Sequence, residues 1–323
     1  MTYTIDVHLS PDEVRHRMRT DAIEGLQAAP KSIPPVWFYD ERGSQLFEDI
    51  TRLPEYYPTR AERHLLELHA DAIAHLSKAD TLVELGAGAC NKTRVLLDAL
   101  ENSGTLTRYV PFDVSDEFLR DAASALTNDY EALAVHLVIG DFHDHLAEIP
   151  TDGRRMVAFL GGTIGNLSPA QRARFLFDLN CTMTSDDSFL LGTDLVKDRT
   201  RLVAAYDDRA GVTAAFNKNV LRVLNEQLNG DFDPDLFRHV ALWNEDEQWI
   251  EMRLRALSAC DITLRDAGIE VHFSEGEDLL TEISAKFSPE RVEEELAAAG
   301  FVVEGMWGAE EGEFLLTLAH PYC

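Results

Sequence analysis

Three places in the chain combine residue types that could bind a nucleotide. Gly86 and Gly88 lie in VELGAGA, residues 83–89, directly after a short apolar run, while Asp113 and Asp141 end the next two apolar runs. Glycines allow a tight turn and close approach of the backbone to a ligand, and an acidic side chain at a following strand end can accept hydrogen bonds from ribose hydroxyls. Because the carboxyl ends of parallel strands share one edge of a sheet, these residues predict a nucleotide-binding crevice.

The spacing of the glycines favours one class of nucleotide. A dinucleotide fingerprint, Gly-x-Gly-x-x-Gly, requires a third glycine where this chain has Asn91, which argues against a nicotinamide oxidoreductase. The form Glu-x-Gly-x-Gly, followed by acidic residues at the next two strand ends, resembles S-adenosylmethionine (SAM)-dependent methyltransferases. That resemblance implies that Glu84 and Gly86 flank the methionine part of the cofactor, that Asp113 binds the ribose, and that Asp141 and Phe142 contact the adenine.

Lys92 follows the glycine turn, and two histidines follow Asp141. Lys92 lies in the first turn of the helix after the glycines, where the helix dipole favours anions. It is either a solvated surface lysine held at small cost or a residue that meets the carboxylate of the cofactor. The residues Asp141-Phe-His143-Asp-His145 would align metal ligands only in a strand, whereas they begin a turn after one. Asp141 is already assigned to the cofactor and no third ligand is evident, so we expect no metal.

The elements that must position these residues alternate between helix and strand. Buried strands are expected at five short apolar runs, residues 81–85, 108–114, 134–142, 154–162 and 188–196, with helical segments between them. A C-terminal helix and a last strand at 314–319 return to this pattern. The alternation predicts an α/β fold with a parallel, doubly wound sheet, the Rossmann-like core of a class I SAM-dependent methyltransferase.

Two segments interrupt the alternation and predict a second lobe. Residues 31–60 are dense in proline and aromatic residues and are costly to order unless they lie over something. Residues 198–241 look helical, and strands joined by short polar turns follow. We therefore expect a SAM-binding core of residues 61–196 and 286–323, and a substrate-binding α+β lobe of residues 1–60 and 197–285. The lobe segments are expected to close over the cofactor.

Composition excludes several classes of partner. Of the 323 residues, 45% are hydrophobic and 27% are charged, which suits a globular protein with a sizeable core. The formal net charge of −28 should repel phosphate backbones, so we expect no nucleic-acid partner. The chain has no signal-peptide pattern and no run near the ~18 apolar residues of a membrane span, and its 4 cysteines are dispersed. We expect a cytoplasmic monomer that binds no membrane.

Long segments outside the glycine turn resemble one family closely. The residues 31–60, KSIPPVWFYDERGSQLFEDITRLPEYYPTR, carry the longest match, and further matches are FLGGTIGNLSP (159–169), LLGTDLVKD (190–198), and residues 205–219 and 279–287. These segments resemble the L-histidine Nα-methyltransferases of ergothioneine biosynthesis over nearly the whole chain; the main departure lies in the glycine turn. The resemblance implies that SAM is used to trimethylate the α-amine of L-histidine to hercynine. The alternatives are a SAM-dependent methyltransferase for another amino acid or small amine, and a SAM-binding protein without catalysis.

The same resemblance implies a histidine site made of Tyr39, Tyr56, Gly161, Asn166, Tyr206, Glu282 and Ser284. Asn166 and the Tyr206 hydroxyl would bind the substrate carboxylate, with Glu282 and Ser284 on the imidazole nitrogens and Tyr56 at the same polar end. Without the resemblance, each tyrosine would be interpreted as a core residue and Glu282 as a surface carboxylate.

The α-amine would be held by the Gly161 carbonyl and the Tyr39 hydroxyl. The amine must lose a proton before each attack, and Tyr39 or solvent would accept it, which makes Tyr39 the candidate catalytic residue. The rings of Tyr39 and Phe47 would stabilise the growing positive charge by cation–π contact.

Overall fold

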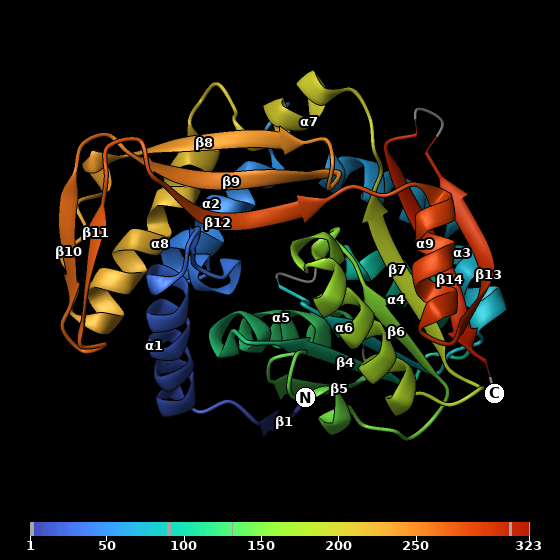
Figure 1. The fold of residues 1–323 in the computed structure, drawn as a ribbon. Coiled ribbons are helices and arrows are strands. Elements are labelled where there is room, and N and C mark those ends of the chain that lie inside the picture. Colours follow the sequence, from blue (N-terminus) through green and yellow to red (C-terminus); the bar gives the residue numbers. More distant parts are fainter. Residues whose placement is uncertain (1–2, 89–91, 131, 310–311, 323) are drawn as a thin grey trace. The chain divides into compact units, whose positions relative to one another are not determined.

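The computed structural model describes residues 3–88, 92–130, 132–309 and 312–322 (Figure 1). Ala89, Cys90 and Asn91 of the glycine loop therefore lie outside the described residues. The chain divides into two compact units. The first consists of Met1–Ser10, Pro58–Val196 and Phe287–Cys323, and the second of Pro11–Tyr57 and Lys197–Lys286.

An eight-stranded sheet forms the centre of the first unit, in the order β1-β5-β4-β3-β6-β7-β14-β13. Its strands are β1 (Thr4–Val7), β3 (Thr81–Leu85), β4 (Arg108–Asp113), β5 (Ala134–Ile139), β6 (Arg155–Phe159), β7 (Ser188–Asp194), β13 (Phe301–Gly308) and β14 (Phe314–Pro321). β14 is antiparallel to both neighbours, and the other neighbouring pairs are parallel. The chain leaves β3 toward β4 and β5 and then returns to β6 on the other side. This reversal is the point at which α/β sheets bind ligands, and the topology confirms the predicted Rossmann-like class I fold.

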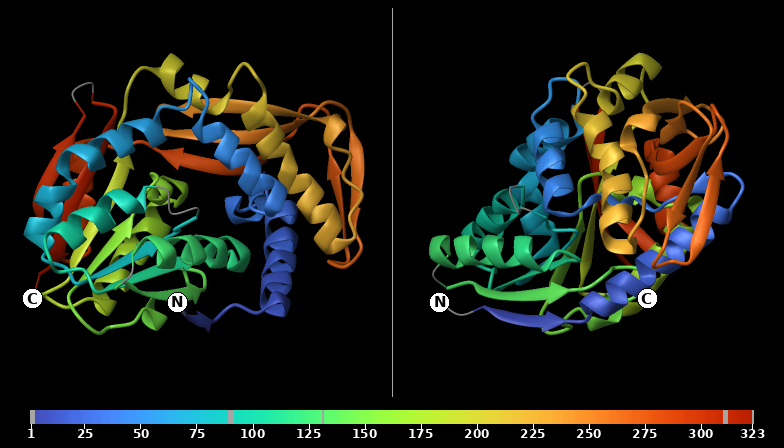
Figure 2. Two further views of the ribbon diagram at one scale, coloured as in Figure 1. Left: turned by 180° about the vertical axis from the view of Figure 1, so that it is seen from behind. Right: turned by 90° about the vertical axis from the view of Figure 1, so that its left-hand side faces the viewer.

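Helices cover both faces of this sheet. They are α3 (Pro58–Ser77), α4 (Thr93–Asn102), α5 (Asp116–Asp129), α6 (Pro169–Thr182) and α9 (Pro289–Ala298), with short 3₁₀ turns η2 (Leu146–Glu148) and η3 (Thr163–Asn166). α3 packs against α4, and α6 packs against α9; Figures 1 and 2 show these two pairs on opposite faces. The sheet is therefore buried on both sides, as the continuous apolar runs of its central strands require.

The second unit is a separate α+β body with its own apolar core. A four-stranded sheet runs in the order β2 (Lys31–Ser32), β12 (Asp278–Ala285), β9 (Trp249–Ala256) and β8 (Phe237–Asn244), beside a pair formed by β10 (Cys260–Leu264) and β11 (Ile269–Phe273). Its helices are α1 (Pro11–Gln27), α2 (Glu41–Thr51), α7 (Arg199–Tyr206) and α8 (Val212–Leu228), with turns η1 (Pro35–Phe38) and η4 (Pro234–Leu236). α8 packs against α2 and against β8 and β9, and its buried Phe216 and Val220 share the core with Met252 of β9.

Some elements differ from the sequence prediction for physical reasons. β1 pairs with β5 at the edge of the first sheet, although residues 1–60 were all expected in the lobe. Its residues are mostly exposed, so no apolar pattern marks it. Within the segment expected to be helical, the chain is extended from Phe237 onward as β8. The segment 31–60 contains the helix α2, which Asp40 caps by accepting a hydrogen bond from the Gly43 N–H at 2.6 Å.

Within the described ranges, no helix is both long and apolar enough to cross a membrane. The same residues contain no group of three or more His, Cys, Asp or Glu side chains that could hold a metal ion.

Glu84 is a buried carboxyl group inside β3. It is 4% exposed, and its Oε2 atom accepts hydrogen bonds from the Tyr109 hydroxyl at 2.6 Å and from the Thr93 hydroxyl. Burial outweighs these hydrogen bonds and raises the pKa of Glu84 to about 7. Part of the population therefore carries a neutral acid at this position near neutral pH.

We expect Glu84→Gln to change the pH dependence of stability. The raised pKa means that the folded state keeps a proton that the unfolded state releases between its ordinary value of 4.5 and about 7, so the free energy of unfolding falls as pH rises through this window. Glutamine can accept the same two hydrogen bonds and does not ionise. The variant should therefore gain stability relative to the wild type between pH ~5 and pH ~8, on the order of 2 kcal/mol.

Urea unfolding of both proteins at the two pH values measures this difference. Glu67→Gln, at an exposed position of the neighbouring α3, is the control. A difference between wild type and Glu84→Gln that does not change with pH would contradict the expected ionisation of Glu84.

Candidate active site

The glycine turn after β3 is fixed to Asp113 at the end of β4. The Gly88 N–H donates to Asp113 Oδ2 at 3.1 Å, and the Ser115 N–H donates to Oδ1 at 3.0 Å. Burial raises the pKa of Asp113 against these hydrogen bonds. Gly86 and Gly88 have φ values of 69° and 50°, and a Cβ atom on either would enter open space. The glycines thus serve the backbone conformation and leave their outer side accessible, while Asp113 has lone pairs left for further donors.

Asp141 and Phe142 follow β5 in a compact turn. Asp141 is 4% exposed; its Oδ1 accepts from the His143 N–H at 2.8 Å, and its own N–H donates to His145 Nδ1 at 3.1 Å. Phe142 is half-buried and packs edge-on against Phe159 and Phe175 at centroid distances of 5.2 and 5.6 Å. The turn therefore presents an ordered carboxylate next to an aromatic ring, a combination that suits a nucleobase.

Lys92 has a protein partner that the sequence did not reveal. It forms an ion pair with Glu62 of α3, whose side chain is fully buried. The other oxygen of Glu62, Oε1, accepts from the Gly161 N–H at 2.6 Å. The sequence does contain a signal for Glu62, because Leu65 and Leu66 follow it by three and four residues and place it on the apolar face of the helix.

Gly161 and Asn166 lie between β6 and α6. Gly161 and Gly162 both have positive φ, 78° and 68°, and lead into η3, which ends at Asn166. Gly161 is exposed and Asn166 is half-buried. The Ser168 capping box then starts α6, so a short, well-defined connection holds both predicted residues at the carboxyl edge of the sheet.

In the second unit, Tyr206 and Ser284 meet a buried lysine. The Tyr206 Oη and Ser284 Oγ atoms are 2.7 Å apart, and the Lys286 ammonium donates to each of them at 2.9 Å. Lys286 is 1% exposed and also lies over the Tyr206 ring, with Nζ 4.7 Å from the centroid. An ammonium group only donates, so both hydroxyl oxygens act as acceptors toward it. Sequence reasoning missed Lys286, although a lysine flanked by Ala285 and Phe287 is a signal of burial.

Tyr39, Tyr56 and Tyr206 belong to one aromatic cluster. Tyr39 contacts Phe47 and Phe216 at centroid distances of 5.7 and 5.5 Å, Tyr56 contacts Phe47 at 6.3 Å, and Tyr56 contacts Tyr206 at 6.2 Å. Phe216 is 2% exposed, whereas Tyr39 is 42% exposed. The cluster therefore extends from the buried ring of Phe216 to the accessible ring of Tyr39.

Glu282 lies on β12 just after an irregularity in strand pairing. The register with β9 shifts between Leu280 and Glu282, so that Glu282 pairs with Met252 and Ser284 pairs with Ile250. The Thr281 hydroxyl, at the shift, shares its single proton between the Met252 carbonyl at 2.9 Å and Asn217 Oδ1 at 2.7 Å. Residues two apart in a strand point the same way, so Glu282 and Ser284 share one face of the sheet.

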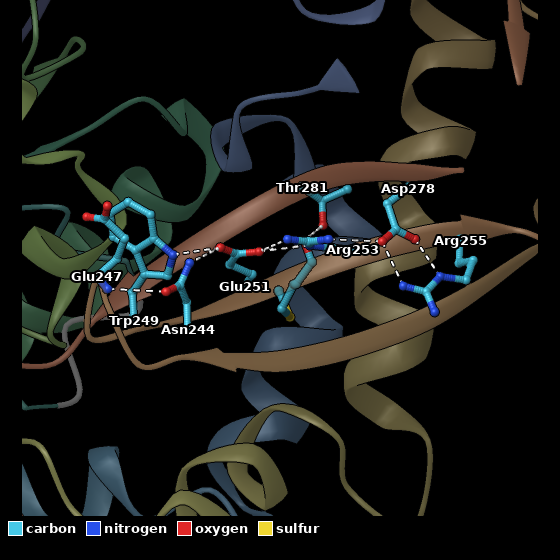
Figure 3. Close-up of polar contacts among 9 residues, drawn as sticks. Asn244, Glu247, Trp249, Glu251, Arg253, Arg255, Asp278 and Thr281 are labelled. Carbon is cyan, nitrogen blue, oxygen red and sulfur yellow. Dashed lines mark hydrogen bonds and ion pairs between the residues drawn. The ribbon is translucent and has the colours of Figure 1, made fainter. Parts of the chain in front are cut away.

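A chain of charged side chains connects β9 and β12 beside this site (Figure 3). Arg253 binds Glu251 on its own strand and donates to Asp278 Oδ2 of β12 at 3.0 Å, and Arg255 donates to Asp278 Oδ1 at 2.7 Å. The hydrogen bond from Arg255 is the main cause that lowers the pKa of Asp278. These cross-strand pairs fix the register of β12 before the irregularity at Thr281.

Comparison with known proteins identifies the family. Residues 18–321 match the family described as histidine-specific methyltransferase, SAM-dependent. Over 319 residues and 99% of each chain, the protein is 53% identical to a histidine N-alpha-methyltransferase of Mycolicibacterium smegmatis and 52% identical to one of Mycobacterium tuberculosis. It is 29% identical over 320 residues to ergothioneine biosynthesis protein 1 of Neurospora crassa, covering 97% of this chain and 36% of that protein. The chain belongs to the family of SAM-dependent, histidine-specific methyltransferases.

Proposed function

We propose that the protein transfers three methyl groups in succession from SAM to the α-amine of L-histidine, which yields hercynine for ergothioneine biosynthesis. Membership of the histidine-specific family, with relatives that match over nearly the whole chain, is the observation that carries this proposal. The aromatic cluster next to the hydroxyl groups of Tyr206 and Ser284 supports it, since an amino acid with a polar ring needs both apolar and hydrogen-bonding surfaces.

The residues of the first unit suit SAM. The open side of Gly86 and Gly88 leaves room for a ligand, Asp113 can accept from ribose hydroxyls, and Asp141 and Phe142 suit an adenine. When bound, the cofactor supplies a methyl group already activated by a positively charged sulfur. The protein must then hold the amine in line with that methyl group, a proximity effect that can contribute ~7–11 kcal/mol.

Residues of the second unit, with Asn166 and Gly161 of the first, are proposed to bind histidine. The Tyr206 hydroxyl and Asn166 bind the carboxylate, and Lys286 strengthens the hydroxyl as a donor because it withdraws electron density from the phenol oxygen. Glu282 and Ser284 bind the imidazole, and Tyr56 closes the same polar end. The Gly161 carbonyl and the Tyr39 hydroxyl hold the amine. The Tyr39 hydroxyl oxygen accepts the amine proton while the hydroxyl's own proton passes to water, so Tyr39 stays neutral; the exposure of this side chain permits this relay.

Mass spectrometry of histidine incubated with SAM and the protein tests the reaction. A product heavier than histidine by three methylene units, with the label of a methyl-labelled SAM, is the expected result. Methylation of a panel of other amino acids but not of histidine would instead favour a different amine as substrate. No turnover of any amine, with SAM bound, would indicate a binding protein.

Asp113→Asn should weaken binding of S-adenosylhomocysteine. A carboxylate that accepts from ribose hydroxyls makes charge-assisted bonds worth ~1.5–3 kcal/mol, so the affinity should fall at least about tenfold. Calorimetry measures the change, and Asp116→Asn at the start of α5, a residue bound to Arg120, is the control. Unchanged affinity in Asp113→Asn would remove Asp113 from the cofactor site.

Glu282→Ala should alter selectivity among amino acids. Loss of the carboxylate leaves an imidazole N–H without its acceptor, so the histidine KM should rise at least about tenfold. Activity toward phenylalanine or tryptophan, whose rings do not need that acceptor, should fall less or rise. Glu275→Ala, which removes an exposed glutamate before β12, is the control. An equal loss on every amino acid would show that Glu282 has only a structural role.

A further inference from the structure

Glu62 is a fully buried carboxylate that the proposed reaction does not use directly. Its Oε2 atom accepts from Lys92, at the start of α4, and its Oε1 atom accepts from the Gly161 N–H at 2.6 Å, after β6. Burial of a carboxylate is costly unless charged or hydrogen-bonding partners compensate it. Losing either partner would leave part of a buried carboxylate unpaired. That free-energy cost holds Lys92 and Gly161 to Glu62.

A glycine in a buried strand provides the space for this carboxylate. Gly192 lies within β7, where every residue is buried, and a Cβ atom built on it would overlap Oε1 of Glu62. Glycine weakens the interior of a strand, and it is found where another group must approach closely. The LLGTD segment thus contains a glycine that no turn requires, and the carboxylate of Glu62 accounts for it.

One partner of Glu62, Lys92, is proposed to bind the cofactor, and the other, Gly161, is proposed to bind the amine. Lys92 follows the glycine turn, and an ammonium group has three donors, so it can bind Glu62 and the carboxylate of the cofactor together. Gly161 is exposed, with φ 78°, and has no side chain to fix it. The hydrogen bond from the Gly161 N–H to Glu62 fixes the orientation of this residue's backbone. The carbonyl of the same residue is the group proposed to accept a hydrogen bond from the substrate amine.

We propose that Glu62 is a positioning residue that couples the cofactor-binding Lys92 to the amine-binding Gly161. This inference rests on the proposed function, from which the roles of the two partners come. Glu62 touches the groups that hold the reactants and not the reacting atoms. Because one rigid carboxylate bonds to both groups, a displacement of either one displaces the other, and the in-line geometry of methyl transfer depends on their separation.

Two substitutions of Glu62 separate positioning from simple stability. In Glu62→Gln the single amide oxygen can accept from one partner while the NH₂ group cannot accept from the other. In Glu62→Asp the charge remains, but the shorter side chain cannot reach both partners. We expect kcat with histidine to fall at least about tenfold in Glu62→Gln, with a smaller loss in Glu62→Asp. Affinity for S-adenosylhomocysteine should change less than threefold in either, since Lys92 remains.

Steady-state kinetics, calorimetry and thermal unfolding are measured on both variants, with Glu67→Gln on the exposed side of α3 as the matched control. A kcat within twofold of the wild type would overturn the inference. The inference would also be overturned if kcat, the affinity for S-adenosylhomocysteine and the melting temperature all fell together, because a structural residue gives that pattern. Product analysis of the wild type decides the proposed function independently, and the kinetic comparison is made with whichever amine the wild type methylates.

A double-mutant cycle keeps the inference testable if Glu62→Gln does not fold. Gly192→Ala adds a methyl group against the carboxylate of Glu62 and should lower kcat in the wild-type background. In the Glu62→Asp background the shorter acid leaves room for this methyl group, so the same change should cost at least about threefold less. Strictly additive effects of Gly192→Ala and Glu62→Asp on kcat would contradict the proposed coupling.

Discussion

The proposed cofactor site depends on one constraint: acidic side chains are buried where the strands of the first unit's sheet end. Glu62, Glu84 and Asp141 are each 4% exposed or less. A buried acid requires donors, and here the donors come from elements far apart in the sequence, such as Lys92 before α4 and Tyr109 on β4. The acids and their donors therefore connect the helix starts and strand ends into one assembly.

In the second unit, paired charged side chains fix the register of two strands. Its sheet carries charged side chains that connect β9 to β12, and the irregularity at Thr281 follows directly after these pairs (Figure 3). The register shift places Glu282 opposite Met252, which is buried in the core beneath α8. Lys286 then lies two residues beyond Ser284 and donates to its hydroxyl. Regular pairing throughout β12 would have reversed the faces of all these residues.

The sequence predicted the central strands of the first sheet, which bury continuous apolar runs, and missed two strands of that sheet that do not. The strand 81–85 was predicted with its observed bounds, because a run buried on both faces is unambiguous. The exposed edge strand β1 and the strand β13 carry no such run. Similarity to a family pointed to residues proposed to touch ligands, such as Tyr39 and Asn166. It did not point to Glu62 or Lys286, because these residues contact other protein groups, and only their burial distinguishes them from surface charges.

The aromatic cluster can be understood from the way the proposed reaction changes its own substrate. Each methyl group added to the amine removes one N–H donor and adds apolar surface, and the final product carries a positive charge that no proton loss can neutralise. A site made only of hydrogen-bond acceptors would therefore bind the amine less well at each step. Aromatic rings compensate, since their faces attract a cation without requiring a donor. Tyr39 combines both properties, with a hydroxyl group for the amine that still carries N–H donors and a ring, packed against Phe47 and Phe216, for the methylated one. The proposed trimethylation thus requires an aromatic side chain with a hydroxyl group at this position, and neither phenylalanine nor serine would provide both.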